Sequence, residues 1–142
     1  MELKIPETLA EWNASSKGYL PGHMGIEFLK IEKDEVVARL TVEKHHTAWN
    51  GYFHAGSVIS LADTACGYGT VNSLPEGAAN FTTVELKSNF LGTVQKGGVK
   101  CIAKPIHSGR TTQVWDAEVT SEETGKTLAH FRCTQMILWP KG

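Results

Sequence analysis

The feature that most limits the possible folds of this chain is one long helical segment set among strands. From Ala55 to about Val71, apolar residues recur every three or four positions and cover a face broad enough for a largely buried helix. Gly, Ala and Ser occupy many positions of this segment, so a sheet could pack closely around it. Pro75 and Gly77 end the pattern. The sequence therefore predicts a central helix over about residues 55–73.

Segments that alternate between apolar and polar residues lie on both sides of this helix. Two of them, starting near Ile26 and at Val36, flank a polar turn at residues 33–35 and predict a hairpin. Short polar turns join four further alternating segments, which follow the helix at residues 81–91, 97–107, 111–122 and 126–139. The chain is thus expected to contain six strands.

The region before the first strand is expected to form a short helix over about residues 6–17, with Pro6 at its first position, and then a loop at Pro21-Gly22. Runs of strands with one inserted helix are typical of an α+β domain whose antiparallel sheet curls around that helix. We expect a single domain of this kind over residues 1–142. Its sheet would have two free edges, and pairing two copies edge to edge would cover one of them, so a dimer is expected.

Composition excludes several classes of function. The chain has 14 Lys and Arg against 15 Asp and Glu, and its net charge of -1 gives no general attraction to nucleic acid or to an anionic membrane. No apolar run approaches the roughly 20 residues needed to cross a bilayer, and the N-terminus is charged where a signal peptide is apolar. Three widely spaced cysteines without a CxxC pair favour buried reduced thiols, and hence a cytoplasmic protein.

A single carboxylate, Asp63, interrupts the apolar helical segment. It is either a polar residue on the solvent face of the helix or an acid that faces a pocket. The neighbouring Leu61, Ala62, Ala65 and Cys66 argue against a simply solvated face. Asp63 lies about two helical turns after Ala55, which we expect to be near enough to face a group bound at the start of the helix.

The segment NGYFHAGSVISLADTACGYG, residues 50–69, resembles the helix-entry motif of the PaaI-like acyl-CoA thioesterases. FTTVELKSNFL and HSGRTTQVWDAEV resemble strand patterns of the same family, and the likeness extends over about residues 25–138. The resemblance implies a hotdog fold, in which an antiparallel β-sheet wraps around one long central helix. It also implies hydrolysis of an aryl or fatty acyl-CoA, by homodimers or homotetramers with active sites at the subunit interface. Coenzyme A would be part of the substrate, and no separate cofactor or metal is expected.

The resemblance also implies roles for individual residues. Asp63 would act as general base or nucleophile, in a pocket whose oxyanion hole comes from the other chain. Ala55 replaces the first glycine of the family's His-Gly-Gly turn but retains the N–H that would hold the oxyanion. Free N–H groups at Ala55 and Gly56, at the positive end of the helix dipole, suit a thioester oxygen that becomes negative. His54 would orient the carbonyl or the loop, or it simply caps the helix.

Two more polar residues complete the expected catalytic set. Asn50 would hold the attacking water through its amide, although an Asn before Gly51 also suits a turn. The loop from Asn50 to His54 is about two residues shorter than in close relatives of this family. Thr83 matches a family Ser or Thr that positions the water; otherwise it is an ordinary β-branched strand residue.

Binding coenzyme A requires cations near its phosphates. Arg110 lies at a predicted hairpin turn from which a guanidinium can reach a phosphate, with Lys87, Lys104 and Arg132 as possible helpers or plain surface charges. Two other functions stay open: a hotdog hydratase or dehydratase of acyl thioesters, and an acyl-CoA binding module without catalysis. A serine triad is not expected, because no GxSxG motif occurs.

Overall fold

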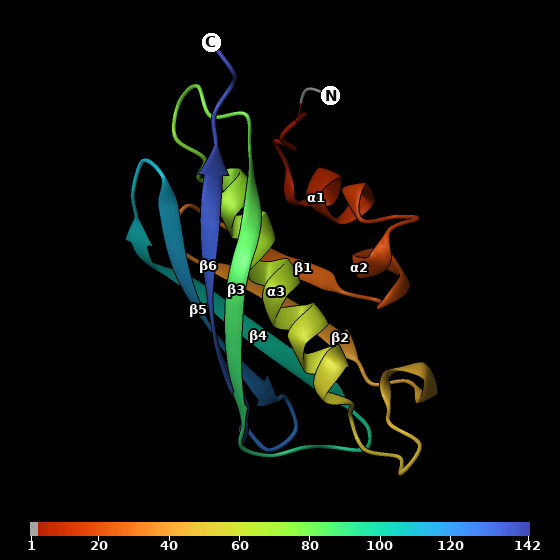
Figure 1. Ribbon diagram of the computed structural model, residues 1–142. Coiled ribbons are helices and arrows are strands. Elements are labelled where there is room, and N and C mark those ends of the chain that lie inside the picture. Colours follow the sequence, from red (N-terminus) through yellow and green to blue (C-terminus); the bar gives the residue numbers. More distant parts are fainter. Residues whose placement is uncertain (1–2) are drawn as a thin grey trace.

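A computed structural model describes residues 3–142 and shows a six-stranded antiparallel sheet wrapped around one long helix (Figure 1). The α+β hotdog architecture predicted from the sequence is confirmed. The central helix starts at the predicted residue and ends one residue early. In chain order the elements are α1 (Leu9–Ser15), α2 (Leu20–His23), β1 (Glu27–Ile31), β2 (Val36–Thr41), the 3-10 turn η1 (Lys44–His46), α3 (Ala55–Asn72), β3 (Asn80–Phe90), β4 (Gly98–Ser108), β5 (Thr112–Ser121) and β6 (Thr127–Leu138).

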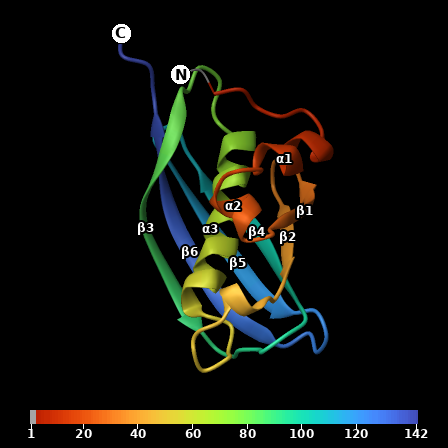
Figure 2. The same ribbon diagram turned by 90° about the vertical axis from the view of Figure 1, so that its right-hand side faces the viewer.

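The strands lie in the order β1-β2-β4-β5-β6-β3, with every neighbouring pair antiparallel. The hairpins β1–β2, β4–β5 and β5–β6 follow the chain, whereas β3 passes to the far edge and pairs with β6. Figure 2 shows the sheet curving past α3, with β1 and β3 at its two edges. Residues 1–2 of the predicted domain lie outside the described residues.

The core lies between α3 and the concave face of the sheet. Alternate residues of β5, from Gln113 to Ser121, are buried there, as the alternation in the sequence predicts. The small residues of α3 allow close packing: a Cβ at Gly69 would collide with the ring of Trp115. Among residues 3–142 no helix is both long and apolar enough to cross a membrane.

The N-terminal region differs from the sequence prediction. Helix α1 starts at Leu9 and not at Pro6, because the Thr8 hydroxyl caps it by accepting the Glu11 N–H at 3.2 Å. The loop expected at Pro21-Gly22 is wrong: the proline lies in the first turn of the short helix α2, where its fixed φ angle is already helical.

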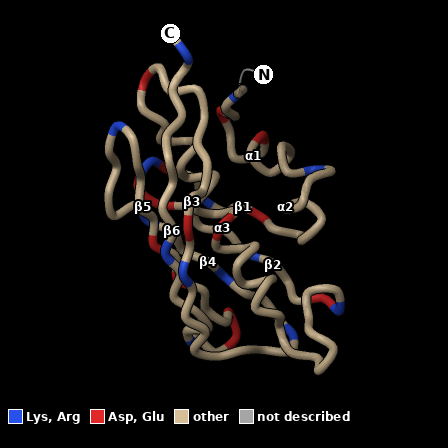
Figure 3. Tube along the Cα trace, viewed as in Figure 1, with Lys and Arg blue, Asp and Glu red and all other residues tan. Residues whose placement is uncertain are grey.

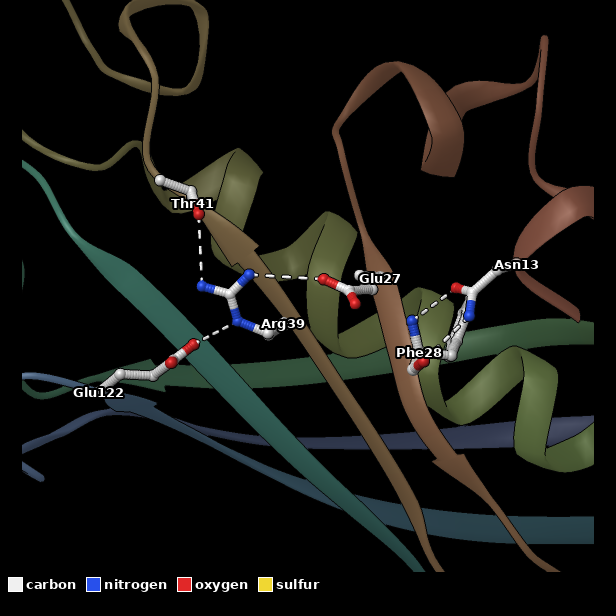
Figure 4. Close-up of polar contacts among 6 residues, drawn as sticks. All are labelled: Asn13, Glu27, Phe28, Arg39, Thr41 and Glu122. Carbon is white, nitrogen blue, oxygen red and sulfur yellow. Dashed lines mark hydrogen bonds and ion pairs between the residues drawn. The ribbon is translucent and has the colours of Figure 1, made fainter. Parts of the chain in front are cut away.

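The two edges of the sheet are treated differently. At the β1 edge the side-chain amide of Asn13, from α1, donates to the Phe28 carbonyl at 3.0 Å and accepts the Phe28 N–H at 2.8 Å (Figure 4). These are the bonds that a neighbouring strand would make, so α1 occupies this edge. The β3 edge has no partner strand among residues 3–142.

Strand β3 also presents unusual apolar exposure. Val84, Leu86 and Phe90 are 49%, 39% and 47% exposed although they lie in an 11-residue strand. Long apolar edges invite another chain to pair with them. The sheet therefore has one closed edge and one that is open to a partner.

Candidate active site

Asp63 is the only charged residue of α3, while Lys, Arg, Asp and Glu are distributed over the sheet and loops (Figure 3). Its Oδ1 atom is buried, and no group among residues 3–142 forms a hydrogen bond with it. Burial raises the pKa of this carboxyl, and no neighbouring cation opposes the effect within the described chain. A buried carboxylate oxygen without a partner lowers the stability of the fold. Asp63 is therefore explained better as a group that binds a ligand or water than as a structural residue.

The start of α3 is capped by His54. Its backbone is extended (φ -68°, ψ 140°), and its Nδ1 accepts the Gly56 N–H at 2.7 Å. The expectation that the Gly56 N–H is free is therefore wrong, because the imidazole occupies it. Ala55 is an exposed residue, and its N–H has no partner among residues 3–142. It is the remaining oxyanion donor at this helix end.

The cap also fixes the tautomer of His54. Because Nδ1 accepts a hydrogen bond, the proton of the neutral ring lies on Nε2. The exposed ring therefore offers an Nε2–H donor next to the Ala55 N–H. Two donors at one helix N-terminus suit a developing negative charge.

A residue that the sequence reasoning did not identify holds this region in place. His46 is 1% exposed; its Nδ1 accepts the Glu43 N–H at 2.9 Å, and its Nε2 lies 2.7 Å from the Met24 carbonyl. Its own carbonyl accepts the His54 N–H at 3.0 Å and the Ser57 hydroxyl at 2.8 Å. Burial lowers the pKa of His46. The neutral ring thus anchors the loop that leads into α3.

Asn50 lies in an exposed turn of this loop. Its Oδ1 accepts the Tyr52 N–H at 3.1 Å, and Gly51 adopts a positive φ of 87°, which glycine tolerates without strain. The structure therefore shows the turn that the Asn-Gly pair allows. The structure records no hydrogen bond from Asn50 to His54 or Asp63, so its part in catalysis stays a prediction.

Ala55 and Asp63 are too far apart to act together within one chain. They are separated by eight residues of one helix, or about 12 Å at 1.5 Å per residue. A reacting thioester carbon has to lie within about 3–3.5 Å of its attacking group and beside its oxyanion donors. The expectation that Asp63 faces a group bound at its own helix start is wrong for this reason.

The side of α3 that carries Asp63 packs along β3 and β6. We call this the α3–β3 seam; it consists of Asp63 and Gly67 on α3, Phe81, Thr83, Leu86 and Ser88 on β3, and Gln135 on β6. The Phe81 ring lies against Gly67, where an added Cβ would be 3.4 Å from it. Thr83 is exposed and pairs in register with the buried Gln135. Thr83 thus lies in the seam beside Gln135, and its role with water stays a prediction.

The cations proposed for coenzyme A fall into two groups. Arg110 lies in the β4–β5 hairpin, at the end of the molecule where α3 finishes (Figure 1), and its guanidinium stacks 4.6 Å from the centre of the Trp139 ring. It is therefore at the opposite end of α3 from Ala55. Its backbone carbonyl also accepts the Trp139 indole N–H at 3.0 Å.

Lys87, Lys104 and Arg132 lie on the other face of the sheet. They form one cross-strand row with Asp116, to which Arg132 donates two hydrogen bonds of 2.5 and 2.8 Å. This row lines a hollow of about 900 Å³ on the face that points away from α3. Within one chain the sheet separates these three residues from Asp63, and the structure does not bring them together with Arg110.

Comparison with known proteins gives a consistent result. Residues 50–128 match the model of the family described as the Thioesterase superfamily. A 1,4-dihydroxy-2-naphthoyl-CoA hydrolase of Listeria monocytogenes is 38% identical over 112 residues, which are 78% of this chain and 89% of the relative. The proofreading thioesterase EntH of Klebsiella pneumoniae is 30% identical over 138 residues, 97% of this chain and 99% of that protein.

Solved structures show the same likeness. The crystal structure of thioesterase HI1161 from Haemophilus influenzae superposes with a TM-score of 0.87 at 28% identity, and the match covers 97% of this chain and 95% of that one. The similarity therefore extends over nearly the whole chain and includes both α3 and the paired strands.

Proposed function

Because this chain belongs to the Thioesterase superfamily and is a thioester hydrolase of the hotdog fold, we propose that it cleaves an acyl-CoA of the PaaI-like type to the free acid and coenzyme A, with Asp63 as the catalytic carboxylate. The observation that carries the proposal is the buried Oδ1 of Asp63, without a partner among residues 3–142. The names of the relatives support an aryl acyl group ahead of a fatty one. Neither a hydratase nor a binding module is favoured by these relatives.

Asp63 acts on water as a general base in this proposal. The carboxylate removes a proton from the water as its oxygen attacks the thioester carbon. The Ala55 N–H and the His54 Nε2–H hold the oxyanion. When the intermediate collapses, the carbon–sulfur bond breaks, and the coenzyme A thiolate takes up the proton held by Asp63. Burial raises the pKa of the carboxyl, which makes it a stronger base.

The proposed site takes its two halves from two chains. Ala55 and Asp63 lie about 12 Å apart on their own helix, and the β3 edge is open to a second copy. Antiparallel pairing of two β3 strands by a two-fold axis turns one copy upside down relative to the other. The α3 start of one chain then lies toward the Asp63 side of its partner. We therefore propose a homodimer, which is also the unit from which a tetramer would form.

The same symmetry supports Arg110 as a contact for coenzyme A. Arg110 lies where α3 ends, and inversion of the partner brings that end toward the Ala55 end of the first chain. The guanidinium, held by stacking on Trp139, is then placed to bind a phosphate.

Three buried free cysteines support a reducing compartment, and we propose the cytoplasm.

Release of free thiol from a series of aryl and fatty acyl-CoAs tests this function. Asp63→Asn should lower turnover on the best substrate by about 100-fold or more, because a proton acceptor is lost. Asp34→Asn makes the same chemical change in an exposed turn and should leave turnover unchanged. Turnover of the Asp63→Asn protein near that of the unaltered enzyme would show that Asp63 is not the catalytic carboxylate.

A further inference from the structure

Two of the unpaired buried oxygen atoms of the molecule lie on facing elements. Among residues 3–142, four buried side-chain atoms form no hydrogen bond: Asp63 Oδ1 on α3, Ser88 Oγ on β3, and both Oε1 and Nε2 of Gln135 on β6. Ser88 projects from β3 toward the helix side of the sheet, because its cross-strand partner Phe131 belongs to the core. An alanine there would avoid the cost of an unpaired buried hydroxyl, so stability does not explain the serine.

The rotation of α3 directs Asp63 toward β3 and β6. On one side of it, the Cys66 thiol neighbours the Cys133 thiol of β6. On the other side, Gly67 lies against the Phe81 ring of β3, which is 3.4 Å from the position of an added Cβ. At about 100° per residue, Asp63 lies between these two directions on the helix surface, about 60° from Cys66 and about 40° from Gly67. Its side chain therefore points into the seam between the helix and these two strands.

Ser88 lies at the same level of the seam as Asp63. Helix α3 and strand β6 run in the same general direction (Figures 1 and 2). Asp63 lies three residues before Cys66, or about 4.5 Å at the helical rise. Phe131, the register partner of Ser88, lies two residues before Cys133, or about 6.6 Å at the strand rise. The positions of Asp63 and Ser88 along the seam therefore differ by only about 2 Å.

The other polar residues of the seam lie farther along it. Gln135 comes two residues after Cys133, and Thr83 pairs with Gln135 in register. Both are therefore about 11 Å from the level of Asp63. Of the two hydroxyl residues of the seam, Ser88 is the one placed to contact this carboxyl.

The two oxygens of the Asp63 carboxyl differ in their surroundings. Oδ1 is buried, whereas Oδ2 is not among the buried unpaired atoms and forms no hydrogen bond within residues 3–142. The titratable groups that face the carboxyl from α3 and β6 are the thiols of Cys66 and Cys133. The charged and titratable side chains of β3 and β6 that line the hollow on the opposite face of the sheet are Glu85, Lys87, His130 and Arg132. One oxygen is thus accessible to water, and the other lies against the seam.

We propose that Ser88 is a positioning residue for Asp63: its hydroxyl donates to Oδ1 and holds the carboxylate so that Oδ2 faces the attacking water. Rotation of the two side chains forms this bond. It satisfies both buried oxygens at once, because the hydroxyl is a donor and an ionised carboxylate only accepts. A base that is oriented by a further group is a recurring arrangement in active sites. This inference rests on the proposed thioesterase function and adds the group that orients its base.

Threonine and valine at position 88 give the central test, because they have nearly the same shape and differ in the hydroxyl; both suit a strand. Ser88→Thr should keep kcat for the best acyl-CoA within about 3-fold, whereas Ser88→Val should lower it by about 10- to 100-fold, since a hydrogen bond to a charged group is lost. KM should change by less than about 3-fold in both variants, because Ser88 acts through Asp63 and not on the substrate. Equal kcat in the two variants would overturn the inference.

The pH dependence of kcat separates orientation of the base from simple packing. Burial raises the pKa of Asp63, and a hydrogen bond to the ionised form opposes that effect. Ser88→Val should therefore move the acidic limb of kcat upward by about 1 pH unit or more, while Ser88→Thr leaves it in place. Burial also raises the pKa of the Cys66 thiol, which keeps that group out of the acidic limb. An acidic limb at one pH in both variants and in the unaltered enzyme would overturn the hydrogen bond.

The effect of Ser88→Val should also depend on Asp63. In the Asp63→Asn protein, which has no carboxylate to orient, Ser88→Val should reduce the residual turnover by less than about 3-fold. A further loss as large as that in the otherwise unaltered enzyme would show that Ser88 acts independently of Asp63. Thr82→Val is the matched control: it removes a hydroxyl from the exposed face of the same strand and should leave kcat and the acidic limb unchanged.

Assembly separates this role from a contact between chains. A Ser88 hydroxyl that bonds to a partner chain across the β3 edge would make the Ser88→Val dimer dissociate at higher concentrations in size-exclusion chromatography, with its acidic limb in place. That result would overturn the inference. If Ser88→Val fails to fold, Ser88→Ala takes its place in the comparison with Ser88→Thr, and the same outcomes decide.

Failure of this inference is distinguishable from failure of the proposed function. Full activity of Ser88→Val together with loss of turnover in Asp63→Asn would overturn the role of Ser88 and still support the proposed function. Absence of thiol release from the entire acyl-CoA series would instead refute the proposed function and this inference with it.

Discussion

Replacement of Ala55 by proline isolates one half of the proposed site. Proline removes the backbone N–H, which is the remaining oxyanion donor, and it suits the first position of a helix. The preceding residue has φ -68° and ψ 140°, which a residue before proline readily adopts. Helix α3 should therefore form normally in Ala55→Pro, while kcat falls by about 100- to 1000-fold, as for loss of one oxyanion donor.

The distance along α3 gives a quantitative test of where the two halves come from. Ala55 and Asp63 of one chain are about 12 Å apart, too far to contact the same thioester carbon. If each site combines Ala55 of one chain with Asp63 of its partner, a mixed dimer of Ala55→Pro and Asp63→Asn has one site with both defects and one site with neither. Random exchange of equal amounts gives half mixed dimers, so activity should recover to about one quarter of the unaltered level.

The assay is thiol release after the two inactive variants are mixed, dissociated in mild denaturant and allowed to reassociate. Each variant treated alone is the control for damage or contamination. As a further control, a chain that carries both substitutions is reassociated with an equal amount of the unaltered chain. Activity should then fall to about one quarter of the all-unaltered level, because both sites of every mixed dimer carry one defect. The mixed sample could instead show only the average of the activities of the two variants reassociated alone. That result would refute a site shared between chains.

Two further predictions concern stability. The pKa of His46 is lowered from 6.5 by burial, so the unfolded chain binds a proton at a higher pH than the folded chain does. His46 therefore lowers the stability of the folded chain as the pH falls below about 6.5, and it has no such effect above that pH. Tm measured from pH 8 to 5 should show this decline in the unaltered protein but less of it in His46→Gln. Gly69→Ala should lower the free energy of unfolding by about 1–3 kcal/mol in urea titration, because the added methyl group collides with the buried Trp115 ring; an unchanged midpoint would show that α3 can shift away from the sheet.

Local patterns in the sequence were sufficient for most of the elements. The 3.6-residue period and the small residues of α3 predicted its span to within one residue, and alternation predicted all six strands. The position of β3 beside β6 depends on contacts between distant segments, which alternation does not encode. The short helix α2 was missed because Pro21-Gly22 suits a loop and a first helical turn equally well.

The site was predicted less completely than the fold. Asp63 stood out because a carboxylate in an apolar helix is rare, whereas the loss of the Gly56 N–H depends on the rotamer of His54, which no sequence pattern specifies. The distance between Ala55 and Asp63 follows from residue counting alone, because the sequence pattern already places both residues on one helix. Ser88 also left a signal, since it is a polar residue between the apolar Leu86 and Phe90 on one face of an alternating strand.

The two hydrogen bonds between the Asn13 side chain and the Phe28 backbone have a consequence for solubility. A sheet with two open edges can pair with another copy at each edge. Such pairing can continue without limit and produces fibres. In this chain α1 covers the β1 edge, so pairing of two copies through β3 would leave no open edge. Edge-to-edge growth would then stop at two copies, and α1 would cover both ends of the continuous sheet.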